Sequence, residues 1–230
     1  AAAMACETAW TRALALLAGS TTYAFTAVLA VMLAGLALGS LAFAQRRRDS
    51  AAGLAGLLGA LAFLVALGLA VYDLLPWLLV RATGGRFPVL GAFAFAGLLA
   101  GPPAILMGAI LPWTAALAAP NRAGLGRGIG SLYAANTAGA IVGSAAAGLL
   151  LLPLWGWRGT AAAMAVLYAG AAAALLCRSG RKAAAAAALL PGLLGMRFAR
   201  GNARLEASGM FLYGPYYTGS ASFSDFSADL

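Results

Sequence analysis

The sequence contains no histidine, only two cysteines, and few charged residues, which make up 9% of its 230 residues. Without histidine, the chain cannot build a His/Cys metal site, a haem ligand set or a histidine-based catalytic triad. A disulfide framework is disfavoured as well, so Cys6 and Cys177 are interpreted as small buried hydrophobic residues. We therefore expect no metal, no cofactor and no catalytic residue.

Acidic residues are also scarce, since 15 Lys and Arg stand against 6 Asp and Glu and the pI is about 10.4. The basic residues lie beside hydrophobic stretches and not along one polar face, which argues against nucleic acid as a partner. Hydrophobic residues make up 63% of the chain and the mean hydropathy is +0.90. This composition is typical of a multi-pass membrane protein whose first partner is the lipid bilayer.

Long uncharged windows separate the charges, and each of them contains 19 residues or more. A helix needs roughly 20 residues to cross a hydrocarbon core of about 30 Å. The alternating pattern of barrel strands is absent, so the windows predict helices. They are 13–45, 50–72, 87–121, 128–157 and 159–177.

These windows predict an all-α bundle of about six to seven transmembrane helices over residues 1–196, followed by a polar tail or linker at 197–230. The expected helices are 1–18, 23–44, 51–72, 89–119, 130–152 and 160–176. The stretch 89–119 contains Gly101-Pro102-Pro103 and Pro112, which should kink or break it into one span and an interfacial helix. The apolar segment 183–195 is short, and whether it crosses or lies on the surface is left open. The abrupt start, without Met, suggests that residues precede Ala1.

The bias of Lys and Arg between loops predicts the orientation. The loops after the second, fourth and sixth spans carry eight basic residues, against three in the loops after the third and fifth. The first set should be cytoplasmic, in the inner membrane. The eight are Arg46, Arg47, Arg48, Arg122, Arg127, Arg178, Arg181 and Lys182; the three are Arg81, Arg86 and Arg158.

Three polar residues within the spans form a candidate intramembrane site, namely Glu7, Arg12 and Asn136. Ionisable groups cost about 2.5 to 3.5 kcal/mol at mid-depth, so they face a bundle interior, a partner charge or water. Glu7 and Arg12 are five residues apart and point about 140° from each other, which argues against a direct pair. Either Glu7 lines a polar cavity, or both residues lie near the interface and tie their helix to a neighbour. Asp73 is interpreted as an interfacial helix end.

Small residues recur every four positions in two spans, as Gly35 and Gly39 and then as Gly139 and Gly143. Without a hydrophobic force between helices in lipid, small residues let helix backbones approach closely, so we interpret these glycines as packing positions. The glycine-rich run 124–130 lacks the preceding strand and the Lys-Ser/Thr pair of a phosphate-binding loop. It is interpreted as a mobile turn between spans.

Three ordered blocks of sequence resemble the membrane domain of spermidine-synthase-like proteins, the fused major-facilitator-like and spermidine synthase family. They are Glu7-x-x-Trp10-Thr11-Arg12 with Gly19 to Phe25 and Gly35 to Ser40; Met107-Gly108-Ala109-x-Leu111-Pro112; and Gly130 to Gly143, continuing to Leu152-Pro153. In that family, a bundle of about six or seven helices commonly precedes an α/β domain that transfers aminopropyl from decarboxylated S-adenosylmethionine to putrescine.

The resemblance ends where that chemistry would begin. The tail has no glycine-rich nucleotide loop and few acids, so no catalytic residue is carried over. The resemblance implies a non-catalytic membrane anchor or scaffold, with its own missing soluble domain as partner. The alternatives are an accessory subunit packed among other membrane subunits, and a transporter-like bundle for polyamines or small solutes.

Overall fold

The computed structural model describes residues 1–18, 22–46, 50–75, 77–78, 81, 88–118 and 125–201. The polar tail from residue 202 lies outside these residues. The described part is helical and contains no strand, as the sequence predicted. Its elements are α1 (Ala2–Ala18), α2 (Thr22–Arg46), α3 (Ala51–Val71), α5 (Pro88–Ala118), α6 (Leu125–Ala146), the π-helical turn η2 (Ala147–Leu151), α7 (Leu152–Arg178), α8 (Lys182–Ala188) and α9 (Leu190–Arg197).

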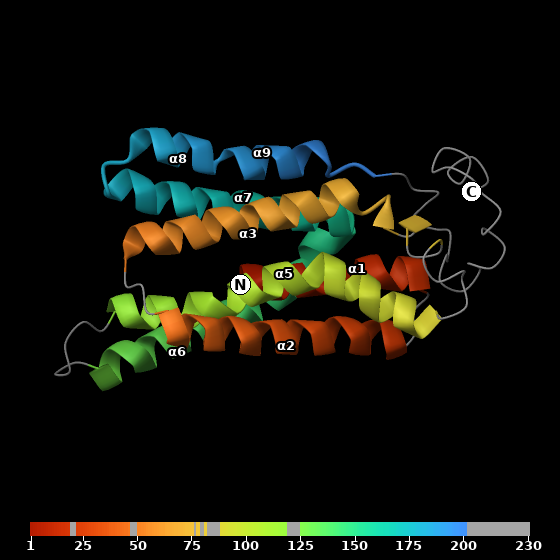
Figure 1. The fold of residues 1–230 in the computed structure, drawn as a ribbon, viewed down its shortest axis with the longest axis horizontal. Coiled ribbons are helices and arrows are strands. Elements are labelled where there is room, and N and C mark those ends of the chain that lie inside the picture. The colour runs from red at the N-terminus through yellow and green to blue at the C-terminus, as the bar shows by residue number, and fades with distance from the viewer. Residues whose placement is uncertain are drawn as a thin grey trace.

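The helices lie side by side along one long axis (Figure 1). α1 is the central element of one half, since it contacts α2, α5, α6 and α7. α2 packs along α5, and α3 packs along α7. The C-terminal ends of α2, α5 and α7 gather at one end of the bundle. We call this end the basic end, because the sequence carries its eight loop Lys and Arg residues at and after these helix ends.

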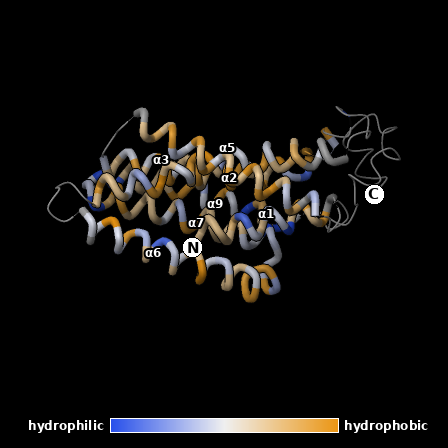
Figure 2. Tube along the Cα trace, turned by 90° about the horizontal axis from the view of Figure 1, so that it is seen from below, coloured by the Kyte–Doolittle hydropathy of each residue, from blue (hydrophilic) through white to orange (hydrophobic). Residues whose placement is uncertain are grey.

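Hydrophobic residues are distributed along the helices (Figure 2), and many large hydrophobic side chains are exposed. Large side chains such as Leu149, Leu154 and Ile141 are 76%, 72% and 64% exposed. Among the described residues, four helical segments are long and apolar enough to cross a membrane: Phe25–Ala44, Ala51–Val71, Phe93–Ala118 and Gly128–Arg178. Monomeric soluble proteins rarely expose apolar area on this scale.

Small residues bring the helices together in the core. Among the described residues, alanine is the commonest buried residue. On α2, Gly35 faces Ala104 and Gly39 faces the backbone of Ile105; on α5, Gly108 faces the backbone of Leu36. We call this contact the α2–α5 glycine seam. Close backbone approach at small residues is how helices pack when lipid removes the hydrophobic force between them.

The expected division of 89–119 into a span and an interfacial helix is wrong. α5 is one continuous helix with Pro102, Pro103 and Pro112 inside it. A proline removes one N–H from the helix ladder and fixes φ at a helical value, so packing against a neighbour can hold the helix through it. α2 supplies that packing, because Val31 lies 3.7 Å from the position of a Cβ on Gly101.

The glycine-rich run was also interpreted wrongly as a turn, since residues from Leu125 onward form the first turns of α6. A loop was expected between the helices 130–152 and 160–176. The structure has a sharp corner at Gly156 there instead. Gly156 has φ +67°, a value that L side chains rarely adopt. The corner turns the chain back, so that Gly128–Arg178 is two limbs and not one straight span (Figure 1).

The segment 183–195 forms α8 and α9, which run back along the bundle beside α7 (Figure 1). Gly180, at φ +75°, ends α7, and the N–H of Arg181 donates to the carbonyl of Leu176 at 3.0 Å. On α9, a Cβ at Gly192 would lie 3.1 Å from Ala169, and one at Gly195 would lie 3.2 Å from Ala165. The chain therefore leaves α9 at the end opposite the basic end.

Candidate functional site

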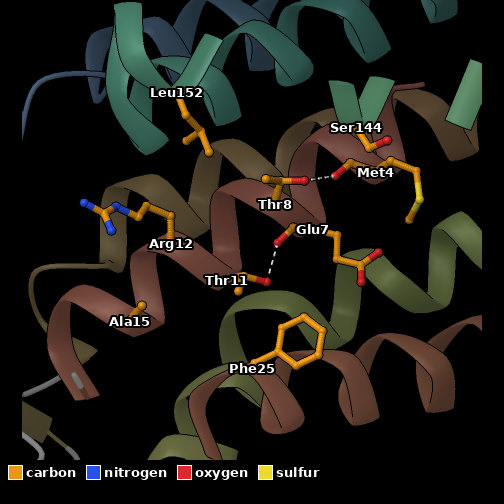
Figure 3. Close-up of a pocket in the computed structure, with 9 residues that line it drawn as sticks. All are labelled: Met4, Glu7, Thr8, Thr11, Arg12, Ala15, Phe25, Ser144 and Leu152. Carbon is orange, nitrogen blue, oxygen red and sulfur yellow. Dashed lines mark hydrogen bonds between the residues drawn. The ribbon is translucent and has the colours of Figure 1, made fainter. Parts of the chain in front are cut away.

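A pocket of about 470 Å³ opens on the flank of α1, between α1, the start of α2 and the α6–α7 limbs (Figure 3). We call it the Glu7 pocket. Its walls include Glu7 and Arg12 from α1, Phe25 from α2, Ser144 from α6 and Leu152 from α7. Most of the wall is apolar, and the polar groups are few, as in ligand sites generally.

The two faces of α1 explain how the pocket forms. Cys6, Ala9 and Ala13 are fully buried in the core, and they recur at helical spacing. Glu7, Thr8 and Thr11 share the other face with Met4, Arg12 and Ala15, and all six line the pocket. α1 therefore carries its polar residues on one stripe, because the opposite stripe packs against the other helices.

The structure brings Glu7 and Arg12 to one pocket but does not pair them. Figure 3 shows the carboxylate and the guanidinium pointing toward opposite ends. An ion pair does form between two other residues, Arg158 and Asp73. Asn136 does not join the site, since it lies two turns before Ser144 on an exposed part of α6.

The predicted packing glycines lie outside this site. Gly35 and Gly39 belong to the α2–α5 glycine seam, and Gly139 and Gly143 face Ala1 across the α1–α6 contact. Both cysteines were predicted to be buried, but they differ in exposure. Cys6 is buried, while Cys177 is exposed at the basic end. The interpretation of Cys177 as a buried residue is therefore wrong, since it lies in the last turn of α7, where the helix leaves the core.

A second polar site, which the sequence did not reveal, surrounds Arg158 at the end of the bundle opposite the basic end. Arg158 is 5% exposed and forms a salt bridge with Asp73, which is 32% exposed. The guanidinium also lies 4.8 Å from the ring centre of Tyr72 and 4.9 Å from that of Trp157. We call these four residues the Arg158 cluster. Asp73 lies just past the end of α3, as the sequence predicted, whereas the interpretation of Arg158 as a loop charge is wrong because Arg158 lies within α7.

The Arg158 cluster joins helices from both halves of the bundle. Asp73 and Tyr72 follow α3, and Trp157 and Arg158 belong to α7. The hydroxyl of Tyr72 donates to the carbonyl of Ala13 on α1 at 2.8 Å. A buried charge is tolerated when it is paired and hydrogen-bonded, and the rings around the guanidinium add cation–π attraction.

We expect Tyr72→Phe to lower the free energy of unfolding by about 0.5 to 1.5 kcal/mol, the usual net value of one hydrogen bond. The substitution removes the bond to Ala13 and keeps the ring between Arg158 and Phe95. Chemical denaturation in detergent micelles measures the change. Tyr133→Phe is the control, because Tyr133 is 54% exposed on α6; equal effects of the two variants would contradict the role of the buried bond.

No known protein family, curated protein or solved structure matches this chain. The sequence and the geometry of the two polar sites therefore carry the functional proposals.

Proposed function

We propose that the chain is an integral membrane domain of a spermidine-synthase-like protein, serving as a non-catalytic anchor or scaffold. The apolar surface and the four long apolar segments support membrane residence. The three sequence blocks support the family.

One observation carries the proposal, which is that residues of the three blocks meet in space. Gly39 of the first block lies against α5 within one turn of Gly108 of the second. Glu7 of the first block shares its pocket with Ser144, which directly follows the Gly143 of the third. Blocks far apart in the chain thus form one packing unit, as expected for the signature of a single domain.

The end of α9 also offers a place where an anchor would hold a soluble domain. After α9, the chain passes directly against Arg158, so that a Cβ at Gly201 would overlap the guanidinium. The segment leaving the bundle therefore rests on the buried guanidinium of Arg158. A connector seated in this way gives a C-terminal domain a defined exit point.

Two measurements test the proposal. Residues 1–230 fused to a soluble reporter should stay in the membrane fraction after an alkaline carbonate wash, and release into the supernatant would contradict the anchor. The natural polypeptide should have an intact mass well above 22.9 kDa, since the fused version of the family carries an enzyme domain. A natural product of about that mass, with no further domain, would overturn the fused-enzyme version.

We further propose that the basic end is cytoplasmic. Because α9 runs back along α7, Arg197 and Arg200 lie toward the opposite end and add to the loop residues Arg81 and Arg86, while Arg158 is neutralised by Asp73. The comparison becomes eight basic residues against four. The bias keeps its direction, though the margin is smaller than the sequence alone suggested.

Thiol labelling tests this orientation with the native cysteines. We expect a membrane-impermeant maleimide to label Cys177 in inside-out vesicles and not in intact cells, and Cys6 to stay unlabelled because it is fully buried. In a Cys177→Ala background, Arg200→Cys should label from the outer side only, because α8 and α9 separate the two positions. Labelling of both positions from the same side would contradict the orientation and the α8–α9 crossing.

A second candidate function, an accessory subunit of a larger membrane assembly, is favoured by one feature of α6. This helix is exposed along most of its length, including Asn136 and Thr137. Asparagine in an apolar helix commonly hydrogen-bonds to a neighbouring helix. Asn136→Leu should then release the chain from its complex in native gels, and a stable, active lone monomer would argue against this candidate.

A further inference from the structure

The polar groups of the Glu7 pocket are acceptors at the end that holds the carboxylate. The hydroxyl of Thr8 donates to the carbonyl of Met4 at 2.8 Å, and the hydroxyl of Thr11 donates to the carbonyl of Glu7 at 2.9 Å. Ser144 uses its proton in the same way, on the carbonyl of Ile141 at 3.1 Å. Each hydroxyl donates its hydrogen bond to a carbonyl of its own helix. Its oxygen therefore remains available as a hydrogen-bond acceptor for a ligand in the pocket.

The carboxylate of Glu7 adds a negative charge to these acceptors. Within the described ranges, no residue donates a hydrogen bond to it, and its one neighbouring cation on the helix, Arg12, points to the other end of the pocket (Figure 3). The ring of Phe25 lies on the same side as the carboxylate in this view. An acid, hydroxyl oxygens and an aromatic face together suit an ammonium group, which has donors and no acceptor.

We propose that the Glu7 pocket binds a primary ammonium group on an alkyl stem, with the ammonium at Glu7 and the stem along the apolar wall. The pocket opens on the flank of α1, and its wall includes Met4 and Leu152. Such a ligand has two sources, the headgroup of an ethanolamine phospholipid or a free alkylamine. This inference is independent of the anchor proposal, because it rests on the pocket alone.

Competitive lipid binding tests the proposal on the full chain in detergent. Native mass spectrometry with equimolar ethanolamine and choline phospholipids should show preferential retention of the ethanolamine lipid, since the quaternary choline group has no N–H to donate. We expect Glu7→Gln to reduce that preference roughly tenfold, the factor that corresponds to about 1.4 kcal/mol. A preference that Glu7→Gln leaves unchanged would overturn the proposal.

Thr8→Val and Thr26→Val form a matched pair that separates the site from the fold. Both threonines bond back to a carbonyl four residues earlier, at 2.8 Å in each case, but Thr26 lies outside the pocket on an exposed face of α2. Thr8→Val should weaken the preference and Thr26→Val should not, with both proteins folded by size-exclusion chromatography. Equal loss in both variants would count against an ammonium site.

A second arm identifies the source of the ammonium. n-Butylamine should raise the thermal midpoint of the wild type and not of Glu7→Gln if the ligand is a free amine, whereas butyltrimethylammonium should have no effect. An ethanolamine-lipid preference without a butylamine shift assigns the site to lipid. Absence of both the lipid preference and the butylamine shift overturns the proposal.

Discussion

Asp73→Ala should lower the free energy of unfolding by about 3 to 5 kcal/mol, the cost of leaving a buried charge without its partner. Arg158 is 5% exposed, and its salt bridge to Asp73 supplies the compensating charge. The rings of Tyr72 and Trp157 attract the guanidinium but cannot neutralise it. The variant should also loosen the contact between α3 and α7, because the pair joins the end of one helix to the start of the other.

Chemical denaturation in micelles, followed by far-ultraviolet circular dichroism, measures this loss. The double variant Asp73→Leu/Arg158→Met should recover much of it, because removing both charges together leaves neither unpaired. Arg178→Ala is the control, since Arg178 is exposed at the last turn of α7, and it should change the stability by no more than about 0.5 kcal/mol. Equal stability of the single and double variants would contradict the role of the ion pair.

The sequence did not predict this pair because the partners are 85 positions apart and each interrupts an apolar window. Counting charge-free windows treats every charge as a boundary, so Asp73 and Arg158 were assigned to helix ends and loops. One signal was present in the sequence. Tyr72-Asp73 and Trp157-Arg158 are aromatic residues next to opposite charges at the edges of two spans, a combination suited to a shared cation–π and ion-pair cluster.

The helices themselves could be predicted, because charge-free length and composition decide them locally. Contacts between helices could not. Glu7 and Arg12 were recognised as costly residues, and the structure adds the pocket that they share, which needs Ser144 and Leu152 from distant parts of the chain. Asn136 could not be assigned from helical periodicity, which gives the spacing along a face but not which face meets a neighbour.

The prediction that 89–119 divides into two helices was wrong for a related reason. The rule that Pro102 and Pro103 break a helix describes an isolated helix in water. Here α2 packs beside the same stretch of α5, and Val31 is close to Gly101. Packing against α2 holds the backbone of α5 where the prolines remove its hydrogen bonds. This tertiary contact therefore overrides the local preference of proline against the helix interior.

Gly39→Ala should lower the free energy of unfolding by about 3 kcal/mol, at the upper end of the range for overpacked sites. A methyl group at Gly39 would overlap the carbonyl oxygen of Ile105, and the next atoms that it meets are also backbone. No side-chain rotation relieves such a clash, so α2 and α5 must move apart along the glycine seam. The sign of this change in the free energy of unfolding is informative, because alanine in a helix interior is otherwise more favourable than glycine by about 0.5 to 1 kcal/mol.

Gly59→Ala is the matched control for this prediction. Gly59 also lies within a long apolar helix, α3, but nothing is within 4 Å of the position of its Cβ. It should leave the stability unchanged or raise it, while Gly39→Ala lowers it, as measured by the same denaturation in micelles. If both variants were equally stable, the backbone contact between α2 and α5 would be looser than the structure describes. Opposite signs from one chemical change would show that helix propensity governs the free position and that backbone contact governs the seam.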